Sequence, residues 1–251
     1  MKIAISGKGG VGKTTIMALI AEQFKREGKE VLVIDADSSP HMAQTLGIED
    51  VDKITPIAEM KDLLIERSGK VEGSPFYNIN PQVDDLTGKF MLEKDGIRLM
   101  VLGAIDTGDS GCACAENTVL KRLLTKLLLS PTQVVLLDME AGVEHLGRGT
   151  IANVDHLLIV TLPTNSSIRT GLKIKKLAHD VKVGTTHFVA NRVVDDDDKE
   201  FLIKGLKEEP IAYFPDSRDI LKAERSGKAV TSEIDTVHEV VKGLIMHLKD
   251  T

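Results

Sequence analysis

The stretch Gly7-Lys8-Gly9-Gly10-Val11-Gly12-Lys13-Thr14-Thr15 decides the fold of this chain. It matches the spacing G-x-x-x-x-G-K-[ST] of a phosphate-binding loop through Gly7, Gly12, Lys13 and Thr14. An aliphatic run precedes the loop and a helical pattern follows it, which is the context that such a loop requires. Its glycines let the backbone close around phosphates with the N–H groups pointing inward. The stretch therefore predicts a site for nucleotide phosphates.

Each polar side chain of this loop has an expected role toward ATP and Mg²⁺. Lys13 is expected to pair with the β- and γ-phosphate oxygens, Thr14 to hold Mg²⁺ through its hydroxyl, and Thr15 to reach the α-phosphate. The backbone that cradles the phosphates is provided by Gly9, Gly10, Val11 and Gly12.

Short aliphatic runs alternate with amphipathic stretches along the chain. The runs predict strands at Lys2–Ser6, Glu30–Ala36, Gly96–Leu102, Gln133–Asp138, His156–Leu162, Thr185–Asn191 and Pro210–Phe214. The stretches between them predict helices at Thr14–Glu27, Pro56–Ser68 and Asn117–Leu129, one capped by Ser166 or Ser167 that runs to Asp180, and one over Ile234–Leu248. This alternation predicts an α/β fold, a doubly wound and mostly parallel sheet flanked by helices. We expect one P-loop ATPase domain over 1–251, with an irregular surface insertion around 69–94.

Composition argues against several classes of function. The net charge is −6, and phosphate contacts to nucleic acid need clustered cations. Aromatic residues make up 3% of the chain, too few for base-stacking platforms. No apolar run is long enough to cross a bilayer, and two cysteines cannot form a disulfide framework. We expect a cytoplasmic protein that binds neither nucleic acid nor membrane.

Carboxylates follow two of the predicted strands. Asp35-Ala36-Asp37 ends the second strand, and the run Val134–Asp138 is typical of a Walker B strand. The carboxyl edge of a parallel sheet is where ligands bind, so these side chains are expected beside the phosphate loop. Asp138 is expected to bind Mg²⁺, through a water molecule. Asp37 has a second interpretation as a helix N-cap, which is compatible with the first.

The cysteines Cys112 and Cys114 form a C-x-C segment ahead of a predicted helix. Side chains two residues apart in extended backbone point the same way, so both thiols can face one metal ion. A helix N-terminus also favours thiolates. Closed thiolate sites need four ligands, and a two-fold dimer would supply the missing pair. The alternative is that the thiols are two small buried hydrophobic groups.

The loop K-G-G-V-G-K-T-T resembles the deviant Walker A motif of the MinD, ParA, ArsA and nitrogenase iron-protein superfamily. The resemblance implies that Lys8 crosses a dimer interface to the partner's nucleotide and that Asp37 orients the attacking water. It also implies that Met139–Gly142 is the second switch, with Gly142 close to the γ-phosphate. Asn191-Arg192 is similar to the family's base-recognition corner. The family text D-x-D-P is altered here, because the proline is shifted to Pro40.

A narrower resemblance rests on the cysteine segment and on Asp138–Thr150, which reads D-M-x-A-G-x-E-H-L-x-R-G-T. Together they are similar to the CooC-type ATPases, the nickel-insertion accessory proteins of carbon monoxide dehydrogenase. The resemblance covers essentially the full length. It implies an ATP-hydrolysing metallochaperone that dimerises with ATP or metal and binds Ni²⁺ or Zn²⁺ at the shared cysteines. The implied client is a nickel-dependent carbon monoxide dehydrogenase or acetyl-CoA synthase.

Two other functions stay open at this point. An electron-delivery ATPase like the nitrogenase iron protein would hold an Fe–S cluster at the dimer interface. That family takes one cysteine from each of two separate segments, whereas here both come from one C-x-C. A MinD- or ParA-like positioning ATPase would need a membrane-binding tail or a basic DNA face, and the C-terminal stretch has no cationic face.

Overall fold

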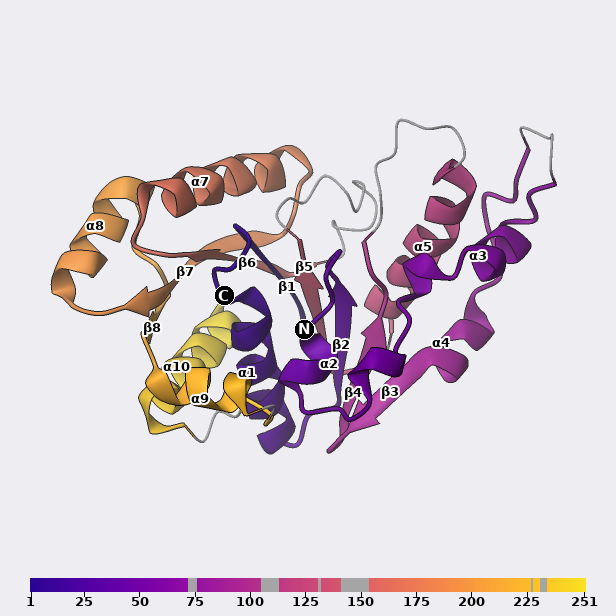
Figure 1. Cartoon of the computed structure of the whole chain (residues 1–251). Helices are drawn as coiled ribbons and strands as arrows, with labels where there is room; N and C mark the ends of the chain where they lie inside the picture. Colours follow the sequence, from indigo (N-terminus) through magenta and orange to yellow (C-terminus); the bar gives the residue numbers. More distant parts are fainter. Residues whose placement is uncertain (72–75, 105–112, 131, 141–153, 227, 231–233) are drawn as a thin grey trace.

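A single eight-stranded sheet organises the computed structural model of the chain (Figure 1). The structure describes residues 1–71, 76–104, 113–130, 132–140, 154–226, 228–230 and 234–251. The strand order is β3-β4-β2-β5-β1-β6-β7-β8, and every neighbouring pair except β3–β4 is parallel. The predicted fold class, a mostly parallel α/β sheet flanked by helices, is confirmed.

The strands are short and aliphatic. They are β1 Lys2–Gly7, β2 Val31–Ala36, β3 Met91–Lys94, β4 Ile97–Val101, β5 Val134–Met139, β6 His156–Thr161, β7 Thr185–Val193 and β8 Ala212–Pro215. The α-helices are α1 Lys13–Arg26, α2 Met42–Thr45, α3 Lys61–Ser68, α4 Asp84–Phe90, α5 Ala113–Leu128, α7 Asn165–Asp180, α8 Asp196–Leu206, α9 Arg218–Arg225 and α10 Asp235–Asp250. Two 3₁₀ turns, Val51–Lys53 and Ile57–Glu59, precede α3.

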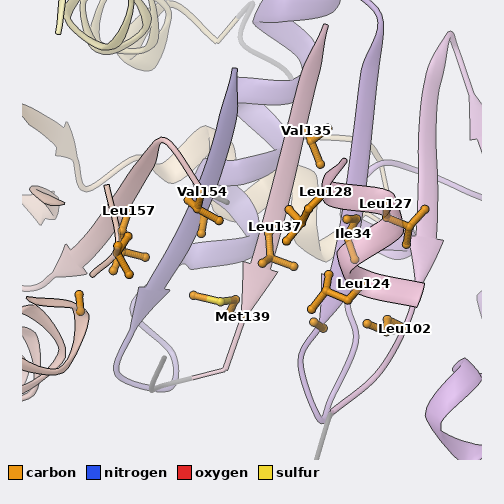
Figure 2. Packing of buried hydrophobic residues seen from close by; sticks show 14 of the residues in the cluster. Ile34, Leu102, Leu124, Leu127, Leu128, Val135, Leu137, Met139, Val154 and Leu157 are labelled. Carbon is orange, nitrogen blue, oxygen red and sulfur yellow. The ribbon is translucent and has the colours of Figure 1, made fainter. Parts of the chain in front are cut away.

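Helices cover both faces of the sheet, which explains why the strands are apolar without alternation. One core lies between the sheet and α3, α4, α5, α7 and α8, and the other lies between the sheet and α1, α2 and α10. Figure 2 shows part of the first core, where Leu124 and Leu128 of α5 lie beside Ile34 of β2 and Leu137 of β5. The parallel strands are held in register by this burial, so their carboxyl ends meet at one edge.

Part of the segment expected to be irregular is ordered. Within 69–94 the chain forms α4 and then β3, which pairs antiparallel with β4 at the sheet edge. Asp95 and Gly96 connect the two strands with φ of 50° and 81°. An Asp-Gly pair with two positive φ angles is a preferred hairpin turn, and this dipeptide was the signal for the missed strand.

Three helix starts also differ from the prediction. The helix expected over Pro56–Ser68 is divided into the 3₁₀ turn Ile57–Glu59 and α3, which begins at Lys61, because Met60 between them has the non-helical φ and ψ of −80° and 66°. α5 begins at Ala113, four residues earlier than the expected Asn117. The cap of α7 is Thr164, whose hydroxyl accepts a hydrogen bond from the Ser167 backbone N–H at 3.3 Å, so neither Ser166 nor Ser167 is the cap. The acidic run Asp195–Asp198 forms the start of α8, where the Asp195 side chain caps the helix by accepting from the Asp198 N–H at 3.0 Å.

In the part of the chain that the structure describes, none of the helices has both the length and the apolar character needed to cross a membrane.

Candidate nucleotide site

The phosphate loop connects β1 to α1 at the carboxyl edge of the sheet, between β5 and β6. Gly10 and Gly12 have φ of 77° and 92°, in the left-handed region that glycine adopts without a steric penalty. A side chain at Gly12 would also meet the Asn191 amide nitrogen at 2.4 Å. Both observations explain why these positions of the motif are glycine.

A cavity of about 620 Å³ opens over this loop. Its walls include Gly9, Gly10, Gly12, Lys13, Thr14 and Thr15 of the predicted site, together with Asp37, Glu140 and Arg192. The Lys13 ammonium lies inside, 3.8 Å from an Asp37 carboxylate oxygen. Of the predicted loop residues, Val11 differs in that its side chain is buried in the core. The structure thus brings the two residues predicted for phosphate binding and water activation, Lys13 and Asp37, together.

Asp138 lies at the end of β5 and is completely buried. One carboxylate oxygen accepts a hydrogen bond from the Thr14 hydroxyl at 2.6 Å, and the other, Oδ1, is buried with no hydrogen-bond partner in the described structure. A buried carboxylate beside a hydroxyl is the set of hard oxygen donors that Mg²⁺ prefers. The free oxygen and the adjacent threonine therefore fit a magnesium ion.

Asp35 is a residue of this site to which the sequence analysis gave no separate role. It pairs with Asp138 across β2 and β5 and is completely buried. Its carboxylate accepts hydrogen bonds from the backbone N–H of Met42 at 2.9 Å and of Asp37 at 3.3 Å. Asp35 therefore fixes the loop that carries Asp37. The D-x-D pattern contained the signal, because both aspartates follow the same strand.

The two buried aspartates resist ionisation in the described structure. Burial raises the pKa of Asp35 to about 6, against the opposing effect of its two backbone hydrogen bonds. Burial also raises the pKa of Asp138 to about 7, and the charge of Asp35 adds to this shift, whereas Thr14 and Lys13 oppose it. A divalent cation would relieve both the desolvation and the repulsion.

Asn191 and Arg192 lie at the end of β7, where a smaller cavity of about 190 Å³ adjoins the loop. The Asn191 amide donates to the Val11 carbonyl oxygen at 2.7 Å, and its oxygen accepts from the Arg192 backbone N–H at 2.9 Å. Asn191 therefore supports the phosphate loop as well as lining the small cavity. Its contact with the base of the nucleotide stays a prediction.

Lys8, the other lysine of the loop, is exposed. Its ammonium donates a hydrogen bond to the Ser166 hydroxyl in the first turn of α7 at 3.0 Å.

Two predicted site residues and the side chain of a third lie outside the described part of the chain. Gly142 and Cys112 are not described, and the side chain of Cys114 is not described either, although its backbone belongs to α5. Within the described residues, no group of three or more histidine, cysteine, aspartate or glutamate side chains is arranged to hold a metal ion. The shared thiolate site stays a prediction.

A glycine-rich loop after the first strand, a buried aspartate bonded to the loop threonine and a carboxylate close to the loop lysine define a P-loop nucleotide-hydrolysing protein. The chain belongs to the CobQ/CobB/MinD/ParA nucleotide binding domain family, which matches residues 2–230. It is an ATPase of this family, and its sequence groups with the CooC type.

Two relatives support this placement. The chain is 39% identical to an uncharacterized ATP-binding protein of Methanocaldococcus jannaschii over all of both chains. It is 40% identical to the carbon monoxide dehydrogenase accessory protein CooC of Rhodospirillum rubrum, over 81% of this chain and 78% of the relative.

The solved structures are similar in fold alone. One is the Aquifex aeolicus MinC:MinD cell division protein complex, with a TM-score of 0.72 and 22% identity over 100% of this chain and 96% of that one. The other is a ParA family ATPase from Chlorobium tepidum, with a TM-score of 0.72 and 16% identity over 98% of each chain.

Proposed function

We propose that this ATPase is an accessory protein for the maturation of carbon monoxide dehydrogenase or the related acetyl-CoA synthase, to which it delivers nickel. The observation that carries the proposal is the 40% identity to the protein named as the carbon monoxide dehydrogenase accessory protein of Rhodospirillum rubrum. The C-x-C segment supports it, because Cys112 and Cys114 are the cysteines of the chain and offer half of a four-thiolate site. A cytoplasmic location is part of the proposal.

The geometry supports a division of labour in ATP hydrolysis. In the described structure the Lys13 ammonium is close to the Asp37 carboxylate. When ATP binds, Lys13 would pair with the β- and γ-phosphate oxygens instead of Asp37. Asp37 would then be free to accept a hydrogen bond from the attacking water and orient it. The Asp35 carboxylate keeps the Asp37 backbone in place through its hydrogen bond to the Asp37 N–H.

Thr14 and Asp138 would hold Mg²⁺, which supplies charge neutralisation at the β- and γ-phosphates when bound. Their mutual hydrogen bond brings the hydroxyl and the carboxylate within 2.6 Å of each other. Thr15, Gly142, Asn191 and Arg192 complete the proposed nucleotide contacts.

In this proposal ATP joins two protomers, with Lys8 reaching the partner's nucleotide, and the joined protomers assemble the thiolate site from Cys112 and Cys114 of each chain. Hydrolysis relaxes the switch loops and releases the metal. Nickel is the cargo here, and zinc is a competing occupant, because tetrathiolate sites bind both ions.

The test is a metal titration of the purified protein with its mass monitored. We expect one Ni²⁺ per dimer, and no tight binding in Cys112→Ser or Cys114→Ser, because each substitution removes two of four ligands by symmetry. Asp37→Asn is the matched variant: it should bind ATP and nickel normally but hydrolyse ATP slowly. Wild type should activate nickel-free carbon monoxide dehydrogenase with ATP, and Asp37→Asn should not. One metal ion per monomer, or bound iron and sulfide, would refute the site.

A further inference from the structure

The two lysines of the phosphate loop have different partners. Lys13 is 7% exposed, forms part of the cavity wall and lies near Asp37. Lys8 is exposed, is not among the described residues that line the cavity, and donates to the Ser166 hydroxyl at 3.0 Å. The loop thus turns one ammonium toward the phosphates and the other toward α7.

In the described structure the Ser166 hydroxyl forms no hydrogen bond other than the one with Lys8. Thr164 caps α7 through the Ser167 N–H, and the Ser167 hydroxyl accepts from the Leu162 N–H at 2.9 Å. Thr170 donates to the Ser166 backbone carbonyl, not to its side chain. The cap residues predicted from the sequence are therefore replaced by Thr164, which leaves the Ser166 hydroxyl to Lys8.

The contact holds Lys8 only weakly. The first turn of a helix carries a positive partial charge, which disfavours an ammonium there. A hydroxyl offers a dipole rather than a counter-charge, and Lys8 has no ion pair with a carboxylate in the described part of the chain. Phosphate oxygens carry full negative charge and bind an ammonium more strongly. Lys8 is thus held in a position from which a phosphate can withdraw it.

We propose that Ser166 is a positioning residue for ATP use, which keeps Lys8 on α7 until a nucleotide phosphate competes for it. This inference rests on the proposed function, in which Lys8 reaches the nucleotide of the partner protomer. The Lys8–Ser166 bond must break before that reach is possible. The strength of the bond then sets the ATP concentration at which two protomers join.

Substitutions at Ser166 should act in opposite directions. Ser166→Ala removes the acceptor, and Ser166→Asp replaces it with a carboxylate that forms an ion pair with Lys8. We expect the ATP concentration for half-maximal dimer formation to fall about threefold in Ser166→Ala and to rise about fivefold in Ser166→Asp, the range of an exposed charge contact. Sedimentation across an ATP series measures both.

Asn165→Asp is the matched control. It adds a carboxylate to the same turn of α7, at an exposed residue with no hydrogen bond to Lys8 in the described structure. A general effect of charge at the helix N-terminus would appear in both variants, whereas the proposed contact predicts an effect in Ser166→Asp alone. Equal behaviour of Ser166→Asp and Asn165→Asp would overturn the proposal.

A second cycle separates this inference from the proposed function. The double variant Lys8→Ala/Ser166→Asp should have the same affinity for ATP as Lys8→Ala alone, since the partner of residue 166 is gone in both. If wild type hydrolyses ATP without forming a dimer, the role of Lys8 across an interface fails. The contact is then judged by the KM for ATP, which must still be higher in Ser166→Asp than in Asn165→Asp. A KM that is the same in both rejects it.

Discussion

A pair of ionisable side chains is buried at each end of the strands, one at their carboxyl ends (the carboxyl edge of the sheet) and one at their amino ends (the amino edge). At the carboxyl edge, Asp35 and Asp138 are in register on β2 and β5. At the amino edge, His156 and His187 lie on β6 and β7, with the Nδ1 and Nε2 atoms of their rings 3.3 Å apart. Both pairs are almost completely shielded from solvent, with exposures of 0% for the aspartates and 7% and 6% for the histidines.

Burial favours the neutral form in both pairs, with opposite consequences for protons. It raises the pKa of the two aspartates to about 6 and 7, so they retain protons. It lowers the pKa of His187 to about 4 and lowers the pKa of His156 as well, so the imidazoles lose theirs. The neutral imidazoles bond to each other, whereas Asp138 keeps an oxygen without a partner. Of these two pairs, the aspartates alone keep an unpartnered oxygen in the described structure, and that is where a cation is expected.

The pairs should also give opposite pH dependences of stability. Between pH 4 and 7 the folded aspartates hold protons that the unfolded chain has released, so their contribution to the free energy of unfolding falls as pH rises. Between pH 4 and 6.5 the unfolded histidines hold protons that the folded ones have released, so their contribution rises with pH. The nucleotide-free protein should therefore show a shallow profile below pH 6.5.

Asp138→Asn should have the largest effect, on activity and stability at once. Loss of the carboxylate beside Thr14 should lower kcat for ATP about 100-fold or more, because Mg²⁺ loses a partner. The same change should stabilise the nucleotide-free, magnesium-free protein at pH 8 by about 1–3 kcal/mol, since it removes one buried charge and the repulsion of that charge by Asp35.

Thermal unfolding at pH 8 and pH 5 checks the second half of this prediction. The stabilisation should shrink at pH 5, where the wild-type aspartate is already protonated. A variant that is less stable than wild type at both values would show that the Asp138 carboxylate stabilises the fold, and the contrast between the two edges would not hold.

Much of the carboxyl edge was predictable from the sequence, and the amino edge was not. The spacing of Gly12, Lys13 and Thr14 predicts a phosphate-binding loop, and Asp138 follows an aliphatic strand. The contact of Thr14 with Asp138 then follows, because the carboxyl ends of parallel strands lie at one edge of the sheet. His156 and His187 are 31 residues apart and belong to no local motif. Their contact depends on the pairing of β6 with β7, which no short pattern specifies.

Two different causes explain the wrong predictions at α7 and at β3: several possible cap residues at α7, and a weak apolar pattern at β3. Thr164, Ser166 and Ser167 are all good caps, and the sequence did not rank them; the structure chooses Thr164. β3 is four residues long and only partly buried, so its apolar signal was weak.

His187→Gln should have an intermediate effect. It removes the imidazole whose pKa burial lowers to about 4, so the acid-sensitive contribution of this group to stability between pH 6.5 and pH 4, about 1–2 kcal/mol, should be lost. His156, His247, Glu208 and Lys175 also act on this group, and burial is the largest effect. Chemical denaturation across this pH range measures the slope.

His179→Gln is the matched control for this slope, because His179 is a strongly exposed histidine on α7. Its profile should coincide with wild type. In His187→Gln the pH dependence of the aspartates is no longer offset by that of His187. That variant should therefore become more stable as pH falls from 6.5 toward 4. An unchanged profile would mean that the histidine pair contributes nothing to acid sensitivity.

His247→Ala should have the smallest effect, and it tests how far the amino edge extends. His247 of α10 is exposed and contacts the His187 ring edge-on, with ring centroids 5.5 Å apart. Its charge lowers the pKa of His187 and of His156, although burial has a larger effect on each. Removing it should therefore raise both pKa values slightly, as followed by NMR titration of the imidazole protons. The truncation also lets water approach the pair and weakens the desolvation, which again raises the pKa. Both act in the same direction on the titration, so a fall in the pKa of His187 would show that His247 stabilises the protonated ring by accepting its hydrogen.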